Sequence, residues 1–278
     1  MVRASEPDEE KEIATVRSDD GTELAYERSG SGPPLVLVHG AMFDRSIWEL
    51  GDVRSSLAER TTVYAMDRRN HGDSESSDDF SPEAQIADVV AVAESIDEPV
   101  HLLGHSSGAN YALWAAPRID NLRSLILHEP AAPPDEEIGD ALKETMVEVM
   151  ALLDGGQNEQ ALAMVVSDFA RFAPNERDVL RSSPVWDAHV DTFHRTLLPE
   201  LEAAPEFEWW DLTPFEAIST PTLLLVGSES GHKSMAERLR ETMPNSRLAT
   251  LEGYGHAAHL VAPDRYTDQV LSFVSDVD

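Results

Sequence analysis

The chain contains no cysteine, only three lysines among its 278 residues, and no long run of apolar residues. Without cysteine it has no disulfide, no thiol nucleophile and no cysteine-ligated metal site. No stretch approaches the roughly 18 continuous apolar residues that a membrane-spanning helix requires. Residues 1–12 are charged and have no apolar signal core, so we expect a cytoplasmic protein.

The charge is strongly one-sided, with 52 acidic against 21 basic residues and a net charge of −31. Such a field repels phosphate, which argues against binding to nucleic acid or to an anionic membrane. The acidic residues are spread along the chain, and this pattern indicates a solvated acidic surface. Excess acid with scarce lysine predicts a halophilic protein of an acidic proteome, because salt screens the self-repulsion.

Apolar runs alternate with helical patterns over most of the chain, which predicts an α/β fold with a mostly parallel sheet covered on both faces. The expected strands span residues 12–17, 23–28, 34–38, 62–66, 100–103, 123–128, 221–226 and 246–251. The expected helices beside them span residues 46–60, 81–95, 109–116, 232–242 and 263–273.

This alternation stops between the prolines at positions 130 and 214, where helical periodicity continues without a convincing strand. The helical segments expected there span residues 138–153, 160–172 and 185–201. We therefore divide the chain into a disordered acidic N-terminus (1–11), a core (12–130 and 214–278) and an inserted helical lid (131–213).

The strongest motif is Gly104-His105-Ser106-Ser107-Gly108, placed between a predicted strand and a predicted helix. Gly-x-Ser-x-Gly in this context is the pattern of a nucleophile elbow. The serine must occupy a strained turn, and side chains at the flanking glycines would crowd the neighbouring strand and helix. The turn lifts the Ser106 hydroxyl from the sheet and directs helix N-terminal N–H groups toward an oxyanion.

From about Glu12 to the C-terminus the chain resembles the α/β-hydrolase family. The motifs that carry the resemblance are Leu35-Val36-Leu37-Val38-His39-Gly40, Asp67-Arg68-Arg69-Asn70-His71-Gly72-Asp73-Ser74, the Ser106 elbow and Gly253-Tyr254-Gly255-His256. The resemblance implies an eight-stranded, mostly parallel sheet with an inserted lid, a serine nucleophile and no cofactor. No histidine pair has the His-Glu-x-x-His spacing of a metal site, so we expect no metal.

A serine hydroxyl needs a base, and His256 is the candidate because it lies where the family carries its catalytic histidine. His259 is the competitor, and we interpret it as a packing residue. The family's usual acid position holds Ser230, which has no charge. Glu129, after the strand that follows the elbow helix, and Glu229 both keep the order serine, acid, histidine. We favour Glu129 and keep Glu229 as the alternative.

The oxyanion hole needs two N–H donors, which the resemblance assigns to the backbone of Ala41 and Ser107. Met42, the next residue, could line the pocket. His39 is expected to brace this loop by hydrogen bonding. The charged turn that begins at Asp67 is likewise expected to be structural, bracing the loops of the site.

These features predict a serine hydrolase that acts on a small or medium carboxylic ester through an acyl-enzyme. The same triad also serves carbon–carbon bond hydrolases, lactonases and perhydrolases, so these reactions stay open. A different class, a ligand-binding or catalytically weakened protein of this fold, stays open because of Ser230. The sequence does not indicate an oligomeric state.

Overall fold

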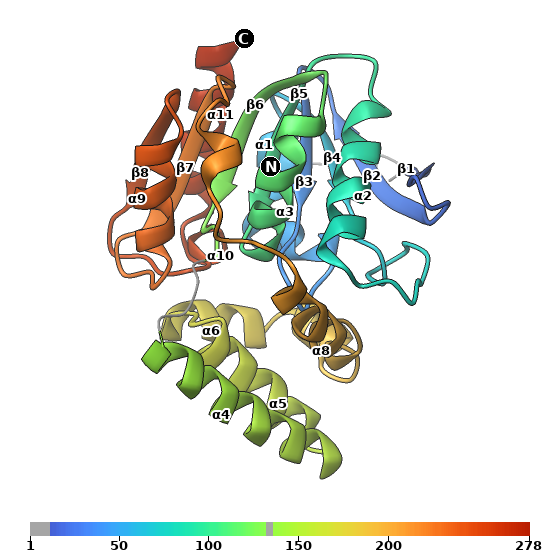
Figure 1. Cartoon of the computed structure of the whole chain (residues 1–278), viewed down its shortest axis with the longest axis vertical. Helices are drawn as coiled ribbons and strands as arrows, with labels where there is room; N and C mark the ends of the chain where they lie inside the picture. Colours follow the sequence, from blue (N-terminus) through green and yellow to red (C-terminus); the bar gives the residue numbers. More distant parts are fainter. Residues whose placement is uncertain (1–11, 132–135) are drawn as a thin grey trace, which may run out of the picture.

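Eight strands form one sheet in the order β1-β2-β4-β3-β5-β6-β7-β8 (Figure 1). The computed structural model describes residues 12–131 and 136–278, so the predicted disordered segment 1–11 lies outside it. The strands are β1 Glu12–Arg17, β2 Glu23–Gly30, β3 Pro34–Val38, β4 Thr62–Met66, β5 Val100–His105, β6 Leu122–His128, β7 Thr222–Gly227 and β8 Ser246–Leu251. The β1-β2 and β2-β4 pairs are antiparallel and all other pairs are parallel, as predicted.

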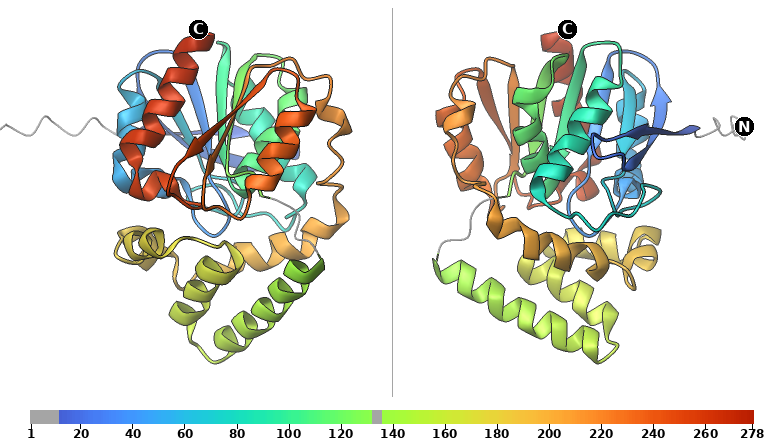
Figure 2. Two further views of the ribbon diagram at one scale, coloured as in Figure 1. Left: turned by 90° about the vertical axis from the view of Figure 1, so that its left-hand side faces the viewer. Right: turned by 45° about the vertical axis from the view of Figure 1, so that its right-hand side comes forward.

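Helices cover both faces of this sheet (Figure 2). The helices of the core are η1 Arg45–Asp52, α1 Val53–Ala58, α2 Pro82–Glu94, α3 Ser107–Ala115, η2 Ala116–Arg118, η5 Thr213–Phe215, α9 Lys233–Thr242, α10 Ala258–Val261 and α11 Pro263–Val277. Alternate residues of one strand pack against different helices. In β3, Leu35 and Leu37 join the cluster that contains residues of α1 and α11, whereas Val36 and Val38 join residues of α2, α3 and α9. A strand buried on both faces explains its continuous apolar run.

The strand β3 pairs with β4 on one side and with β5 on the other, so the order in which successive strands are added to the sheet changes direction at β3. In open α/β sheets, ligands bind outside the carboxyl ends of the strands at such a switch point. The loops that follow β3 and β5 contain Ala41 and Ser106, so the topology brings these two predicted site segments together.

The residues between β6 and β7 form a helical insertion (residues 136–206) that lies as a separate layer beyond the carboxyl ends of the strands (Figures 1 and 2). Its helices are α4 Glu136–Asp154, α5 Asn158–Met164, α6 Pro174–Arg181, α7 Pro184–His189 and α8 His194–Ala203, with short η turns after α5 and α8. The insertion therefore lies over the edge of the sheet at which the predicted site residues gather.

Three of the predicted helices are interrupted. The expected helix 46–60 divides into η1 and α1, because Leu50 is extended and Gly51 adopts a φ of +66°. The expected helix 160–172 ends in a π turn, Val165–Phe169, and the expected helix 185–201 divides into α7 and α8. The short helices α6 and α10 were not predicted. Among the described helices, none has the length and apolar character needed to cross a membrane.

Candidate active site

Ser106 stands alone between β5 and α3, in a backbone conformation with φ 56° and ψ −124°. A positive φ at a non-glycine residue is strained, as the elbow motif predicts. A Cβ at Gly104 would lie 2.6 Å from the Ala109 Cα, and one at Gly108 would lie 2.9 Å from the His39 carbonyl carbon. The predicted crowding at both glycines is confirmed, because strand, helix and the loop after β3 approach one another closely there.

His256 lies in the loop between β8 and α10, with its side chain buried. Its Nδ1 is 3.4 Å from Oε2 of Glu129. With its proton on Nδ1, the ring donates a hydrogen bond to this carboxylate, and the Nε2 lone pair is available as a base. Burial lowers the pKa of His256 to about 3, so the ring is neutral and able to take a proton.

Glu129 directly follows β6, with a φ of 54° that turns its side chain toward the end of β7. Its Oε1 accepts a hydrogen bond of 2.6 Å from the Gly227 N–H, and its Oε2 accepts one from the Ser230 hydroxyl. Burial raises the pKa of Glu129 to about 7, against the opposing effect of these two donors. The structure thus brings Glu129, of the two candidate acids, to His256, whereas the Glu229 side chain is exposed.

Ser230 occupies the position at which the resemblance leads one to expect the acid. Its hydroxyl donates to Glu129 and accepts a 3.0 Å hydrogen bond from the His232 N–H. The His232 ring lies 4.7 Å from the His256 ring, and burial together with His256 lowers the pKa of His232 to about 3. The sequence analysis predicted neither the hydrogen bond of Ser230 to Glu129 nor the contact between the His232 and His256 rings. Ser230 and His232 lie outside the four motifs that carry the family resemblance.

The loop after β3 packs against the nucleophile. A Cβ on Gly40 would lie 3.2 Å from the Ser106 Cβ. His39 braces this loop, because its Nδ1 is 2.8 Å from the Gly40 carbonyl oxygen and its Nε2 accepts a 3.1 Å hydrogen bond from the Arg68 N–H. Ala41 follows on this loop, and Ser107 begins α3, where first-turn N–H groups have no acceptor within the helix.

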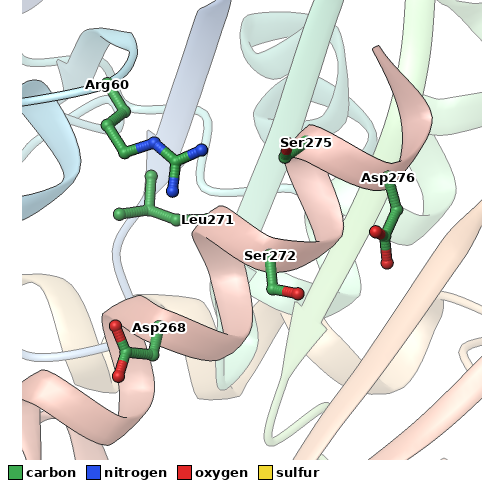
Figure 3. A pocket seen from close by; sticks show the side chains of 6 residues that line it. All are labelled: Arg60, Asp268, Leu271, Ser272, Ser275 and Asp276. Atoms are coloured by element: carbon green, nitrogen blue, oxygen red, sulfur yellow. The ribbon is translucent and has the colours of Figure 1, made fainter.

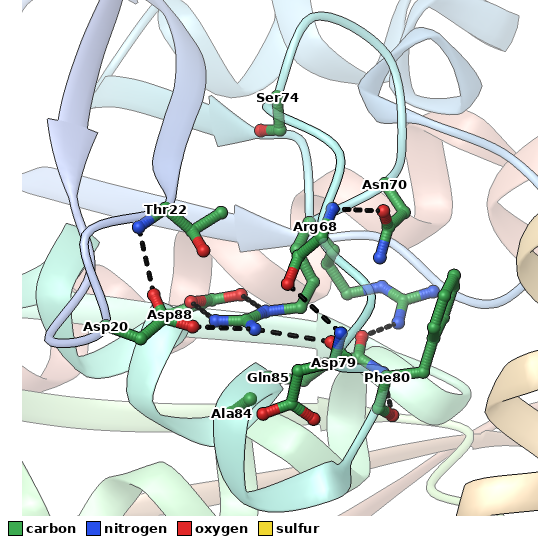
Figure 4. Close-up of polar contacts among 12 residues, drawn as sticks. Asp20, Thr22, Arg68, Asn70, Ser74, Asp79, Phe80, Ala84, Gln85 and Asp88 are labelled. Carbon is green, nitrogen blue, oxygen red and sulfur yellow. Dashed lines mark hydrogen bonds and ion pairs between the residues drawn. The ribbon is translucent and has the colours of Figure 1, made fainter.

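The charged turn after β4 connects this loop to both the core and the insertion. Arg69 makes a bidentate, buried ion pair with Asp88, with distances of 2.6 and 2.7 Å. Figure 4 shows Asp88 near Arg68 of the same turn. Arg68 donates to the Gly40 carbonyl oxygen at 3.0 Å and to Oε1 of Glu200 in α8 at 2.8 Å. The bracing role predicted for this turn therefore has a structural basis.

One group of described residues has the donors for a metal ion, namely His105, His128 and His259, whose ligand nitrogens lie within 4.8 Å of one another. All three are buried, and burial lowers their pKa values, so the rings are neutral. The His105 Nε2 already lies 3.1 Å from the His256 carbonyl oxygen, and no carboxylate belongs to the group. His259 contacts the rings of His105 and Tyr266, in keeping with its interpretation as a packing residue.

A cavity of about 450 Å³ lies between the charged turn and the helical insertion. The residues that line it include Met42, His71 and Phe80 of the core and His189, Phe193 and Thr196 of the insertion. Met42 lines this cavity, but Ser106 and His256 are not among its lining residues, so a role of Met42 in the pocket of the active site stays a prediction. Phe172, also from the insertion, places its ring 5.4 Å from the ring of His256.

A second hollow, of about 400 Å³, lies beside α11 (Figure 3). Its lining residues are Arg60, Asp268, Leu271, Ser272, Ser275 and Asp276. None of them is a predicted site residue, so this hollow does not belong to the site at the elbow.

The model of the alpha/beta hydrolase family matches residues 35–269. The chain belongs to the alpha/beta hydrolase family. Its relatives include the sn-1-specific diacylglycerol lipase ABHD11 of Mus musculus, 26% identical over 260 residues that cover 87% of this chain and 81% of the relative. Another is the monoacylglycerol lipase ABHD6 of Bos taurus, 26% identical over 266 residues, with coverage of 90% and 77%.

Solved structures agree with this assignment. An alpha/beta hydrolase from Sphaerobacter thermophilus is 30% identical, has a TM-score of 0.77 and matches over 94% of this chain and 100% of its own. The esterase RhEst1 from a Rhodococcus species, 23% identical with a TM-score of 0.78 over 96% and 99% of the two chains, shows the shared fold. The resemblance and the fold predicted from the sequence are confirmed.

Proposed function

We propose that this protein is a serine hydrolase that cleaves small or medium carboxylic esters through an acyl-enzyme. The observation that carries the proposal is the 3.4 Å contact between His256 Nδ1 and Glu129 Oε2, at a site whose elbow presents Ser106. A base oriented by a buried carboxylate beside a strained serine is the arrangement that activates a hydroxyl nucleophile. The lipase and esterase relatives support an ester as the substrate.

In the proposed reaction, the Ser106 Oγ attacks the ester carbonyl carbon while His256 Nε2 takes the hydroxyl proton. The N–H groups of Ala41 and Ser107 donate to the oxyanion of the tetrahedral intermediate. The imidazolium then gives its proton to the departing alkoxide, and an alcohol leaves. Water, deprotonated by the same histidine, then attacks the acyl carbon. The bond to Ser106 Oγ breaks, the imidazolium returns the proton to Oγ, and the carboxylic acid leaves. The reaction uses no cofactor.

In this scheme Glu129 stabilises the positive charge that His256 acquires during attack. His256 is neutral in the resting site and becomes a cation during attack. A buried carboxylate next to the ring stabilises that cation more than water would, because the local dielectric is low. Glu229, exposed to solvent, has the weaker claim to this role.

We also propose that the helical insertion serves as a lid over the site. The support is its position beyond the carboxyl ends of the strands and the contact of Phe172 with His256. A cover of this kind excludes water from the reacting groups and shapes the acyl pocket.

The test is intact-protein mass spectrometry after treatment with a fluorophosphonate probe, on the wild type and on Ser106→Ala. One adduct on the wild type and none on the variant is the expected result, because the probe reacts with an activated serine. A panel of p-nitrophenyl esters of increasing acyl length then defines the substrate. No adduct on folded wild-type protein would contradict the proposal and favour a ligand-binding protein of this fold.

A further inference from the structure

One carboxylate of the insertion contacts the loop that carries His256. Glu176 lies in the first turn of α6, and its side chain is completely buried. Its Oε1 accepts a 3.0 Å hydrogen bond from the N–H of Gly255. The N–H of Ala257 also faces this carboxylate and opposes the rise in the pKa of Glu176 that burial causes. Gly255 and Ala257 are the two neighbours of His256 in the chain, so Glu176 holds the catalytic loop on both sides of the histidine.

The local needs of α6 do not explain this arrangement. Glu176 Oε2 accepts a 2.8 Å hydrogen bond from the Ala173 N–H, which satisfies one donor at the start of the helix. A glutamine or a water molecule could do the same at an exposed helix end. A carboxylate buried completely loses its hydration, and only several donors around it offset that loss. The Gly255 donor comes from the loop of His256, 79 residues away in the chain.

The Glu176 carboxylate lies close to the backbone of Gly255. A Cβ on Gly255 would lie 3.0 Å from Glu176 Oε2 and 3.1 Å from Oε1. The loop and the carboxylate therefore leave no room for a side chain between them. The backbone of Gly255 has no left-handed φ, so what opposes a side chain at this position is the proximity of Glu176 and of the Ala173 Cβ, which would lie 3.1 Å away.

We propose that Glu176 is a positioning residue for the catalytic histidine. It fixes the backbone on both sides of His256, so that Nδ1 faces Glu129 and Nε2 faces the nucleophile. Because Glu176 belongs to the insertion, the docking of the insertion and the assembly of the catalytic base are one event. An insertion that lifts away leaves His256 on an unsupported loop. This inference rests on the proposed function and assigns a role to the insertion beyond covering the site.

Glu176→Gln tests the proposal, because it keeps the size of the side chain but turns an N–H₂ group toward the loop donors. The matched control is Glu159→Gln in α5, which removes the charge from an exposed 2.6 Å pair with Arg181 on the same insertion. The readouts are kcat per active site, with sites titrated by the fluorophosphonate, KM for a short p-nitrophenyl ester, and melting temperature.

We expect kcat per active site of Glu176→Gln to fall about 10- to 100-fold with KM changed less than about threefold, since misplacement of a catalytic group by about 1 Å costs about 100-fold. Glu159→Gln should match the wild type. A purely structural role would lower the fraction of titratable sites and the melting temperature but leave kcat per site unchanged. That outcome overturns the proposal.

A double-mutant cycle approaches the contact from the other side. As a single substitution, Gly255→Ala should lower kcat, because its methyl group pushes against the carboxylate of Glu176. In the Glu176→Ala background the carboxylate is gone and the methyl group meets the Ala173 Cβ, 3.1 Å away, so its effect on kcat should be smaller than in the wild-type background. Independent, multiplicative effects would contradict a direct contact in solution. If the wild type fails to react with the probe, the proposed function fails; if it reacts while Glu176→Gln turns over normally, only the present inference fails.

Discussion

Glu129 follows β6, whereas the usual acid position of the family, position 230 in this chain, follows β7. The strands β6 and β7 are parallel neighbours, with His128 paired to Leu225, so their carboxyl ends lie side by side. A side chain at position 129 and one at position 230 can therefore meet at one place. In this chain the carboxylate comes from β6, and Ser230 supplies a hydroxyl donor to it.

Replacement of the acid distinguishes the two candidates. We expect Glu129→Gln to lower kcat/KM by about 10²- to 10⁴-fold, because the imidazolium formed during attack loses its counter-charge. Glu229→Gln should stay within about twofold of the wild type, since its side chain is exposed. The measurement is steady-state hydrolysis of a p-nitrophenyl ester at neutral pH. A large loss in Glu229→Gln with a small one in Glu129→Gln would reverse the assignment.

The same carboxylate makes stability depend on pH. Burial raises the pKa of Glu129 from 4.5 to about 7 in the folded protein. Between these two values the folded state binds more protons than the unfolded state, so the free energy of unfolding falls as the pH rises. Glu129→Gln removes this dependence. We expect its melting temperature, relative to the wild type, to be higher at pH 8 than at pH 4.5.

The measurement is thermal unfolding of both proteins in a series of buffers of equal ionic strength. Glu229→Gln, which removes an exposed carboxyl group outside the buried contact, is the control. A melting-temperature difference between Glu129→Gln and the wild type that stays constant from pH 4.5 to pH 8 would show that Glu129 does not titrate in this window.

At the level of elements, the strands were the most predictable part of the chain. A strand of a parallel sheet is buried on both faces, so its continuous apolar run is visible in the sequence, and each predicted strand matches an observed one within about two residues. The helices of the insertion were less predictable. Their breaks depend on local turns, such as the one between α7 and α8, which periodicity does not reveal.

The residues of the candidate site also differ in how well the sequence predicted them. Ser106 stands in a local motif, and the structure gives it the strained backbone that the motif predicts. The choice between Glu129 and Glu229 depends on which loop faces His256, and that is a property of the packed sheet. Glu176 was not predicted, because its contact with Gly255 joins two segments that share no sequence signal.

A buried ion pair fastens α8 to the core. Arg68, 1% exposed, donates to Glu200, 7% exposed, over 2.8 Å. We expect Glu200→Ala to lower the free energy of unfolding by about 3–5 kcal/mol, because the charge of Arg68 is left buried without its partner. Activity should fall as well, since Arg68 also donates to the Gly40 carbonyl oxygen beside the proposed oxyanion hole.

Equilibrium unfolding in urea measures this effect. The matched control is Glu83→Ala, which removes the partner of Arg118 from an exposed pair of similar length, 2.7 Å. An exposed pair contributes at most about 1 kcal/mol, so this variant should unfold almost as the wild type does. Equal losses in the two variants would mean that the Arg68–Glu200 pair does not hold α8 in place.

At the scale of the whole molecule, the net charge of −31 is concentrated at the surface. Several of the scarce cations are in the interior, where Arg68 and Arg69 are each 1% exposed and paired with acids. The shortage of positive surface groups comes from the composition, since the chain has 21 basic residues against 52 acidic ones. Mutual repulsion among these carboxylates opposes the compact state, and dissolved ions reduce it.

We expect the melting temperature to rise by at least several degrees between 0.1 M and 2 M KCl. Screening explains the rise only if most of it occurs at low salt, because the Debye length has already fallen from about 10 Å at 0.1 M to about 3 Å at 1 M. Sucrose serves as the control, since it stabilises compact states without screening charge. A melting temperature that does not change with KCl, or that rises equally with sucrose, would contradict a fold adapted to high salt.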